Sequence, residues 1–122
     1  METNHIQSYR DLIVWQKSMD LVLLVYKMTE NYPRSEVYGL SSQSRRCPVS
    51  IPSNIAEGRF RGTRKDFRHF LTMAFASGAE LETQLEVALR LKFVKENEDQ
   101  EAVALLTEVM KMLNTMIRKL ND

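Results

Sequence analysis

The sequence predicts an all-α protein, an antiparallel up-down bundle of four helices that forms a single domain over residues 1–122. Apolar residues recur at spacings of three and four along most of the chain, which is the period of one helix face. The chain has only four glycines, and no segment alternates apolar and polar residues as a half-buried strand does. Short polar stretches separate the periodic segments, which favours a bundle of sequential neighbours.

The first helix is expected to begin near Tyr9 to Asp11, after a loose lead-in over residues 1–8. Its predicted face consists of Leu12, Trp15, Met19, Val22, Tyr26 and Thr29. Six more apolar residues widen that face: Ile13, Leu21, Leu23, Leu24, Val25 and Met28. So wide a face predicts a helix that is covered on two sides, in the bundle or at an oligomer interface. Pro33 ends the helix, because proline cannot continue it.

The second helix is predicted from about Leu40 to Phe60 and contains two prolines. Pro48 and Pro52 each remove a backbone hydrogen bond and crowd the preceding turn. We therefore expect a helix that is kinked here, or one that begins afresh near Pro48.

The stretch from Ser50 to Gly58 is polar where a bundle helix is usually apolar. Asn54 lies close to the core-facing stripe, and a buried amide must find hydrogen-bond partners. Gly58 suits either a helix end or a close contact between helices. The favoured interpretation is a buried polar network of Gln43, Asn54, Glu57 and Glu80.

The third helix follows a turn at Gly62 and Thr63, with Thr63 as the predicted N-cap. Its expected inner face consists of Phe67, Leu71, Ala74, Gly78, Leu81, Leu85, Ala88 and Lys92. Small residues from Ala74 to Ala79 favour close approach of another helix over a ligand site. After a polar loop over residues 95–99, the fourth helix carries Val103, Leu106, Met110, Leu113, Ile117 and Leu120 at heptad spacing.

Residues capable of catalysis or metal binding are few. Cys47 lies on an apolar helix face with no histidine nearby in sequence, so a buried structural thiol is favoured over a nucleophile. Glu57, Glu80 and Glu82 resemble the carboxylates of metal-binding bundles, but the Glu-x-x-His motif of such sites is absent. We therefore predict no catalytic residue, no metal and no cofactor, and a protein that is not an enzyme.

The charges separate along the chain although the net charge is only +1. Seven basic residues lie between positions 45 and 69, against two acidic ones: Arg45, Arg46, Arg59, Arg61, Arg64, Lys65 and Arg68. Six of them are arginines, which suit bidentate phosphate contacts, and Phe60, Phe67 and Phe70 are interleaved. The pattern predicts a basic end at the junction of the second and third helices, and an acidic end from Glu80 to Glu101. Nucleic-acid binding and a merely solvated or subunit-pairing surface both stay open.

The sequence resembles the family of the 23S ribosomal RNA intervening-sequence protein over nearly its whole length. The most specific part is Ser50 to Gly58. The other matching parts are Tyr9 to Leu12, Trp15-Gln16, Tyr26, Pro33, Glu36 to Leu40, Gln43, Arg45-Arg46, Asp66-Phe67, Phe70-Leu71, Ala74 and Glu80 to Thr83. The chain departs from the family pattern at Ser44, at Cys47-Pro48 and at Ala76-Ser77.

The resemblance implies a bacterial four-helix bundle that assembles into a homopentamer and has no assigned catalysis. It also implies a relation to the accessory variability determinants of diversity-generating retroelements, which bind a reverse transcriptase and nucleic acid. We therefore expect an oligomer that binds structured RNA through its basic residues, or alternatively a homo-oligomeric scaffold for protein partners. A single cysteine and the lack of a long apolar run favour a cytoplasmic protein, with neither a membrane nor a small-molecule substrate as partner.

Overall fold

The computed structural model describes residues 8–37 and 39–120. Four α-helices make up the bundle: α1 (Ile13–Thr29), α2 (Leu40–Arg61), α3 (Arg64–Arg90) and α4 (Gln100–Lys119). Two short 3-10 helices, η1 (Tyr9–Asp11) and η2 (Arg34–Glu36), precede α1 and α2. The predicted all-α class is confirmed, and the described ranges contain no strand. Residues 1–7 of the predicted lead-in, including His5, lie outside the described residues, as does Tyr38.

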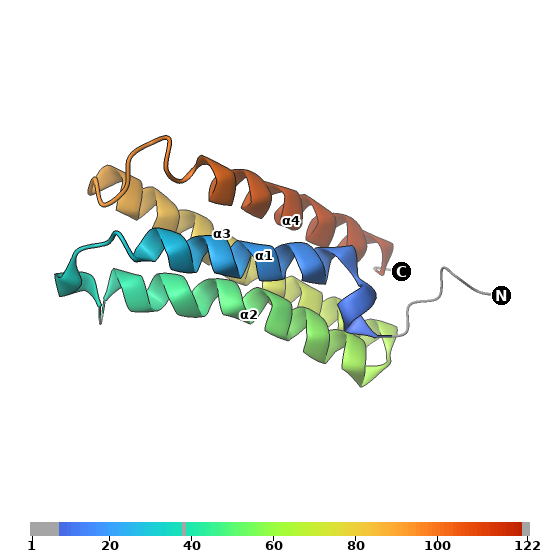
Figure 1. The fold of residues 1–122 in the computed structure, drawn as a ribbon. Coiled ribbons are helices and arrows are strands. Elements are labelled where there is room, and N and C mark those ends of the chain that lie inside the picture. Colours follow the sequence, from blue (N-terminus) through green and yellow to red (C-terminus); the bar gives the residue numbers. More distant parts are fainter. Residues whose placement is uncertain (1–7, 38, 121–122) are drawn as a thin grey trace.

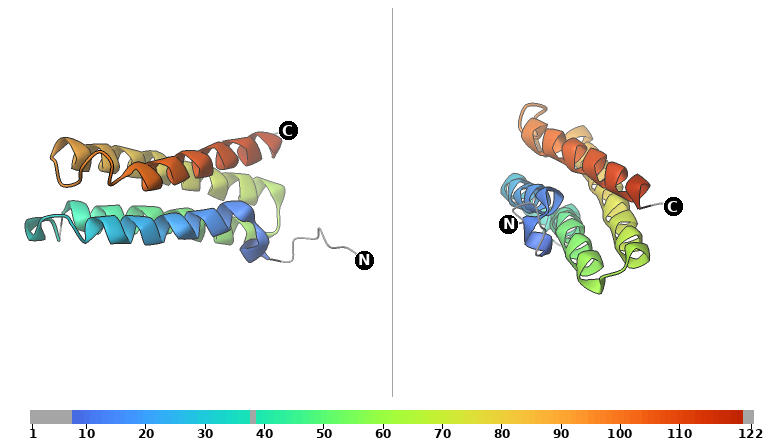
Figure 2. Two further views of the ribbon diagram at one scale, coloured as in Figure 1. Left: turned by 45° about the horizontal axis from the view of Figure 1, so that its top comes forward. Right: turned by 90° about the vertical axis from the view of Figure 1, so that its right-hand side faces the viewer.

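Consecutive helices run in opposite directions, and the chain enters each helix at the end where the previous one stopped (Figure 1). Each helix packs against two others, in the pairs α1–α2, α2–α3, α3–α4 and α1–α4, with the most extensive packing between α2 and α3. The start of α1, the end of α2, the start of α3 and the end of α4 therefore share one end of the bundle (Figure 2). No helix within the described ranges has the length and apolar character needed to cross a membrane.

Helix α1 begins after a capped 3-10 turn. The Ser8 side chain accepts a hydrogen bond from the Arg10 backbone N–H, and the Asp11 carboxylate accepts one from the Ser8 backbone N–H. This reciprocal arrangement is a capping box, which satisfies backbone donors that a helix start leaves unpaired. Ser8, which the prediction places in the lead-in, therefore belongs to the structured part of the chain.

The predicted inner face of α1 is wrong in its middle. Met19 and Tyr26 are exposed, at 39% and 41%. The buried side chains of α1 are Val14, Ser18, Leu21, Val25, Met28 and Thr29. Thr29 belongs to the predicted face and Leu21, Val25 and Met28 to its predicted widening, whereas Val14 and Ser18 do not. The Ser18 hydroxyl donates to the carbonyl of Trp15 at 2.8 Å, which allows a hydroxyl to occupy a core position.

Helix α2 continues without interruption through Pro48 and Pro52, both of which are buried. The alternative in which a helix begins afresh near Pro48 is therefore not observed, while a kink of the axis stays a prediction. Each proline leaves the carbonyl four residues earlier without its helical donor. Gly58 confirms the expectation of a close helix contact, because a Cβ built there would lie 2.7 Å from Phe70 Cβ on α3.

The turn between α2 and α3 has the predicted form. Gly62 adopts a left-handed conformation with φ 86°, which glycine takes at no steric cost. Thr63 then accepts a hydrogen bond from the Asp66 N–H at 3.1 Å and caps α3. The predicted inner face of α3 is buried from Leu71 to Ala88, whereas Lys92 lies beyond the helix at φ 62°.

Helix α4 buries four residues: Ala102, Leu106, Val109 and Leu113. The predicted heptad face is therefore only partly correct, because Val103 is 40% exposed. The expected close approach at the small-residue centre of α3 does occur. Met110 of α4 occupies the space that a side chain at Gly78 would need.

Candidate nucleic-acid interface

One end of the bundle collects basic side chains from three helices. The last turn of α2, the first two turns of α3 and the last turn of α4 meet there (Figures 1 and 2). We call these residues the basic end: Arg59, Arg61, Arg64, Lys65, Arg68, Arg118 and Lys119. The five that come from α2 and α3 confirm the predicted position of the basic cluster at the junction of these helices.

A hydrogen bond joins two of the contributing helices. Arg64 Nη2 donates to the backbone carbonyl of Lys119 at 3.1 Å, so the start of α3 holds the end of α4. The carbonyls at a helix end lack intrahelical donors, and a guanidinium is well suited to bind them. This bond brings Arg118 and Lys119 to the start of α3, where Lys65 lies.

Arg61 is held in place by two neighbours. It forms an ion pair with Glu57, one helical turn earlier, at 2.8 Å. Its guanidinium carbon also lies 4.9 Å from the centre of the Phe70 ring on α3. A cation over an aromatic face is attracted by the ring quadrupole. The side chain therefore has a defined direction although it is half-exposed.

A groove of about 590 Å³ separates the start of α3 from the end of α4. Its lining consists of Arg64, Lys65, Arg68, His69, Thr72 and Leu120. Within the described part of the chain, Arg68 Nε is a buried donor without a hydrogen-bond partner. Arginine donors, a lysine and a threonine hydroxyl are the groups that bind phosphate oxygens in nucleic-acid complexes. The groove therefore has the chemistry of an anion-binding site.

Arg45 and Arg46 do not belong to the basic end, which corrects the predicted grouping. Arg45 lies 16 residues before Arg61, about 24 Å along the helix at 1.5 Å per residue. Its Nε donates to Thr29 Oγ1 at 2.7 Å, and its guanidinium lies 4.9 Å from the centre of the Tyr26 ring. Arg45 therefore joins α1 to α2, while Arg46 is exposed near the start of α2.

Arg118 and Lys119 are the residues of the basic end that the prediction missed. They lie about 50 residues from the predicted cluster in sequence, so a search along the chain does not group them. The signal that would have found them is the topology. In an up-down bundle, the end of the fourth helix lies beside the start of the third.

The predicted buried polar network does not form within the single chain. Gln43, Glu57 and Glu80 are exposed. Asn54 is half-buried, and its amide donates to the Ser50 carbonyl of the same helix at 2.8 Å. Gly58 alone is buried, in contact with α3. The polar side chains between Ser50 and Gly58 therefore lie at the surface of α2 rather than in a buried network.

Cys47 is buried, as the structural interpretation predicts. Its Sγ donates to the Ser77 carbonyl on α3 at 3.0 Å. The pKa of the Cys47 thiol is raised from 9.0 to about 12. The larger cause is burial of the thiol, and the smaller cause is the nearby Glu80 carboxylate. At neutral pH the residue is therefore a protonated thiol, which is the non-nucleophilic form.

Cys47 is expected to react slowly with a thiol reagent such as Ellman's reagent in the native protein. A pKa of about 12 rather than 9.0 lowers the thiolate fraction at pH 8 by roughly 1,000-fold. The native rate should rise with pH up to about 12, because only the thiolate reacts. The same pKa shift lowers the free energy of unfolding as pH rises above 9.0. Above that pH the unfolded chain loses the thiol proton, while the folded state keeps it until about pH 12. Equal rates in buffer and in denaturing urea would contradict the assignment.

The opposite end of the bundle is acidic. Glu96, Glu98, Asp99 and Glu101 lie in the loop before α4 and in its first turn. Burial raises the pKa of the Asp99 carboxyl, and neighbouring Glu86 and Glu96 act in the same direction. Burial also raises the pKa of Tyr32, whose ring packs against Phe93 at 5.7 Å between centroids. The acidic cluster would repel a polyanion, although Arg34, Lys92 and Lys95 lie at the same end, so the two ends differ in the ligands they suit.

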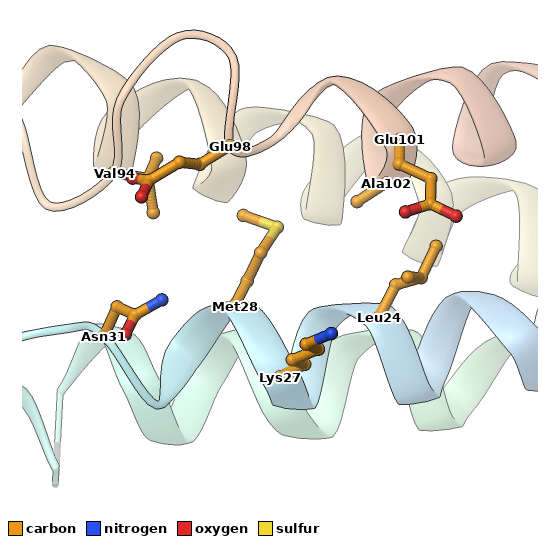
Figure 3. A pocket seen from close by; sticks show the side chains of 8 residues that line it. All are labelled: Leu24, Lys27, Met28, Asn31, Val94, Glu98, Glu101 and Ala102. Atoms are coloured by element: carbon orange, nitrogen blue, oxygen red, sulfur yellow. The ribbon is translucent and has the colours of Figure 1, made fainter.

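A smaller hollow of about 260 Å³ lies between the end of α1 and the start of α4. Leu24 and Met28 point from α1 toward Ala102 of α4, and Val94 closes one side (Figure 3). Lys27, Asn31, Glu98 and Glu101 complete its lining. It is open and apolar at its floor, and its polar side chains are two carboxylates, one lysine and one asparagine, so it lacks the group of arginines that lines the groove at the basic end. Across residues 8–37 and 39–120, no three His, Cys, Asp or Glu side chains gather as metal ligands do.

Two comparisons with known proteins agree with this architecture. The family model described as 23S rRNA-intervening sequence protein matches residues 10–115. A solved structure from Bacteroides thetaiotaomicron VPI-5482, described as a protein of unknown function from the S23 ribosomal protein family, has a TM-score of 0.77 and 27% sequence identity. The match covers 86% of this chain and 98% of that one. No curated protein matches the sequence.

Proposed function

The chain belongs to the family of 23S rRNA-intervening sequence proteins, and from this premise we propose that it is a non-enzymatic oligomeric protein that binds structured RNA through its basic end. The observation that carries the proposal is the groove between the start of α3 and the end of α4, lined by Arg64, Lys65 and Arg68, at the end of the bundle where the last turn of α2 adds Arg59 and Arg61. Phosphate contacts of this kind supply most of the affinity of proteins for nucleic acid.

The near-neutral net charge does not oppose this proposal. A polyanion responds to the local field at the surface it meets, and the acidic cluster of Glu96, Glu98, Asp99 and Glu101 lies at the other end of the bundle. We further propose a homopentamer in which every copy contributes a basic end to one rim. Repetition of the patch would multiply the phosphate contacts of a single chain.

The test replaces three exposed cations of the basic end by glutamine: Lys65, Arg118 and Lys119. None of these side chains makes a hydrogen bond or ion pair that we observe in the described structure. RNA affinity should fall at least tenfold, and the slope of log affinity against log salt should become shallower by about one for each phosphate that the variant no longer binds. Fluorescence anisotropy on a structured ribosomal RNA fragment, at several salt concentrations, measures both quantities.

The matched control replaces three exposed cations of the opposite end by glutamine: Arg34, Lys92 and Lys95. It removes the same formal charge, so a loss of affinity that depends only on net charge would appear equally in both variants. Binding that is equal in wild type, test variant and control would contradict the proposal. Light scattering on the same samples establishes that each protein is assembled to the same mass.

A second candidate function is a homo-oligomeric scaffold that recruits a protein partner and does not bind nucleic acid. The observation in its favour is a line of exposed apolar side chains along α1: Met19, Leu23 and Tyr26, at 39%, 69% and 41%. They lie four and three residues apart and therefore share one helix face, which the bundle covers only in part, with Arg45 over the Tyr26 ring. The absence of RNA binding by a fully assembled oligomer would favour this function over the first.

A further inference from the structure

Phe60 is the most exposed large apolar side chain of the described structure, at 87%. It lies in the last turn of α2, one residue before the helix ends at Arg61. The second most exposed such residue, Leu23 on α1, is 69% exposed. Phe60 therefore presents its aromatic ring to the solvent and is not part of the core of its own chain.

Helix geometry places Phe60 between two arginines. Successive side chains on an α-helix are about 100° apart, and Gly58 faces α3. Phe60 therefore points about 160° away from the Gly58 direction, on the outer side of α2, with Arg59 and Arg61 on either side. The apolar ring therefore lies between two positively charged side chains.

The surroundings of Phe60 are held in fixed geometry. Arg61 is fixed by Glu57 at 2.8 Å and by the Phe70 ring at 4.9 Å. The next residues form the turn in which Gly62 is left-handed and Thr63 caps α3. The ring of Phe60 therefore lies on an ordered helix end rather than on a flexible loop. The loss of conformational entropy is then small when a flat group stacks on the ring.

We propose that Phe60 is a stacking platform for an unpaired nucleobase, with the arginines of the basic end binding the adjoining phosphates. This inference rests on the proposed function and adds the class of substrate: RNA with unpaired nucleotides, such as a loop or a bulge. A free base offers its face to an aromatic ring, whereas the bases inside a continuous duplex are already stacked on each other. Aromatic rings among arginines are the usual composition of single-strand binding surfaces.

The experiment compares two RNA ligands with the same stem, one a hairpin with an unpaired loop and the other a blunt duplex. The assembled wild-type protein should bind the hairpin more tightly. Phe60→Leu keeps an apolar side chain but removes the aromatic face, and should weaken hairpin binding roughly fivefold or more while duplex binding changes little. Phe60→Trp should keep the preference, because indole also stacks. The control Leu91→Ala alters an exposed apolar residue far from the basic end and should change neither affinity.

Tryptophan fluorescence gives a second readout. The chain has a single tryptophan, Trp15, which is half-buried against the core. In Phe60→Trp, a new exposed indole should be quenched when the hairpin is added and not when the duplex is added. Wild type, which carries Trp15 alone, supplies the background signal.

The outcomes separate this inference from the proposed function. If hairpin and duplex bind equally and Phe60→Leu changes neither, stacking is overturned, while the weakening caused by the three-glutamine variant would still support electrostatic RNA binding. If that variant binds as wild type does, the proposed function itself fails. A lower mass for Phe60→Leu in light scattering would make Phe60 a contact between copies of the chain and would also overturn the inference.

Discussion

Replacing Leu81 by alanine is expected to lower the free energy of unfolding by about 2–5 kcal/mol, the usual range for a leucine deleted from a packed core. Leu81 lies in the middle of α3 and is 0% exposed. The substitution removes apolar surface from a site that water does not reach and leaves a cavity that the neighbouring helices fill only in part. Urea unfolding followed by circular dichroism measures the change.

The matched control is Leu91→Ala, which makes the same chemical change where the side chain is 56% exposed. Surface substitutions of this kind usually change stability by no more than about 0.5 kcal/mol. Equal losses of stability in the two variants would mean that Leu81 is not part of the core. A change in the slope of the denaturant dependence would instead point to an altered unfolded state.

The substitution Gly58→Ala is expected to destabilise the protein by about 1–3 kcal/mol, although alanine is the better helix former. The added Cβ would lie 2.7 Å from Phe70 Cβ and 3.2 Å from Phe67 Cδ1. Phe70 Cβ is bonded to the backbone of α3, so it can move away only if the two helices separate. A thermal or urea melt of the variant tests this.

Gly78→Ala is the control that tests whether close packing of α2 on α3 causes the destabilisation expected for Gly58→Ala. There the added Cβ would meet the sulfur of Met110, the distal part of a flexible side chain that is only half-buried. Methionine adapts readily to changes in its surroundings, so the destabilisation should be smaller than at Gly58. If both alanine variants are destabilised equally, close packing of α2 on α3 is not the reason for a glycine at position 58.

The sequence predicts the elements of the fold well because their signals are local. The Gly62-Thr63 turn, the cap on Asp66 and the buried face of α3 each follow from a few neighbouring residues. A basic cluster at the α2–α3 junction is predicted for the same reason, since its members are close in sequence. In these cases a turn or a helix period decides the structure without reference to distant contacts.

The buried face of α1 is predicted only in part, because two stripes at helical spacing compete. The buried stripe contains Ser18, whose polarity marks it as the poorer candidate, yet its hydroxyl binds the carbonyl of Trp15 within the helix. The predicted position of Arg45 is wrong for a related reason. Its charge suggests that it belongs to the basic end, but its contacts with Thr29 and Tyr26 place it between α1 and α2. Choosing between such alternatives requires knowledge of which helix lies opposite.

The separation of basic and acidic residues along the bundle gives this nearly uncharged protein a permanent electric dipole. In the field of a polyanion such a molecule experiences a torque that turns its basic end forward before any contact is made. Orientation of this kind raises the rate of productive encounters, and the gain should disappear as salt shortens the screening length. Its recognition behaviour would therefore follow the direction of the dipole rather than the isoelectric point of about 7.9.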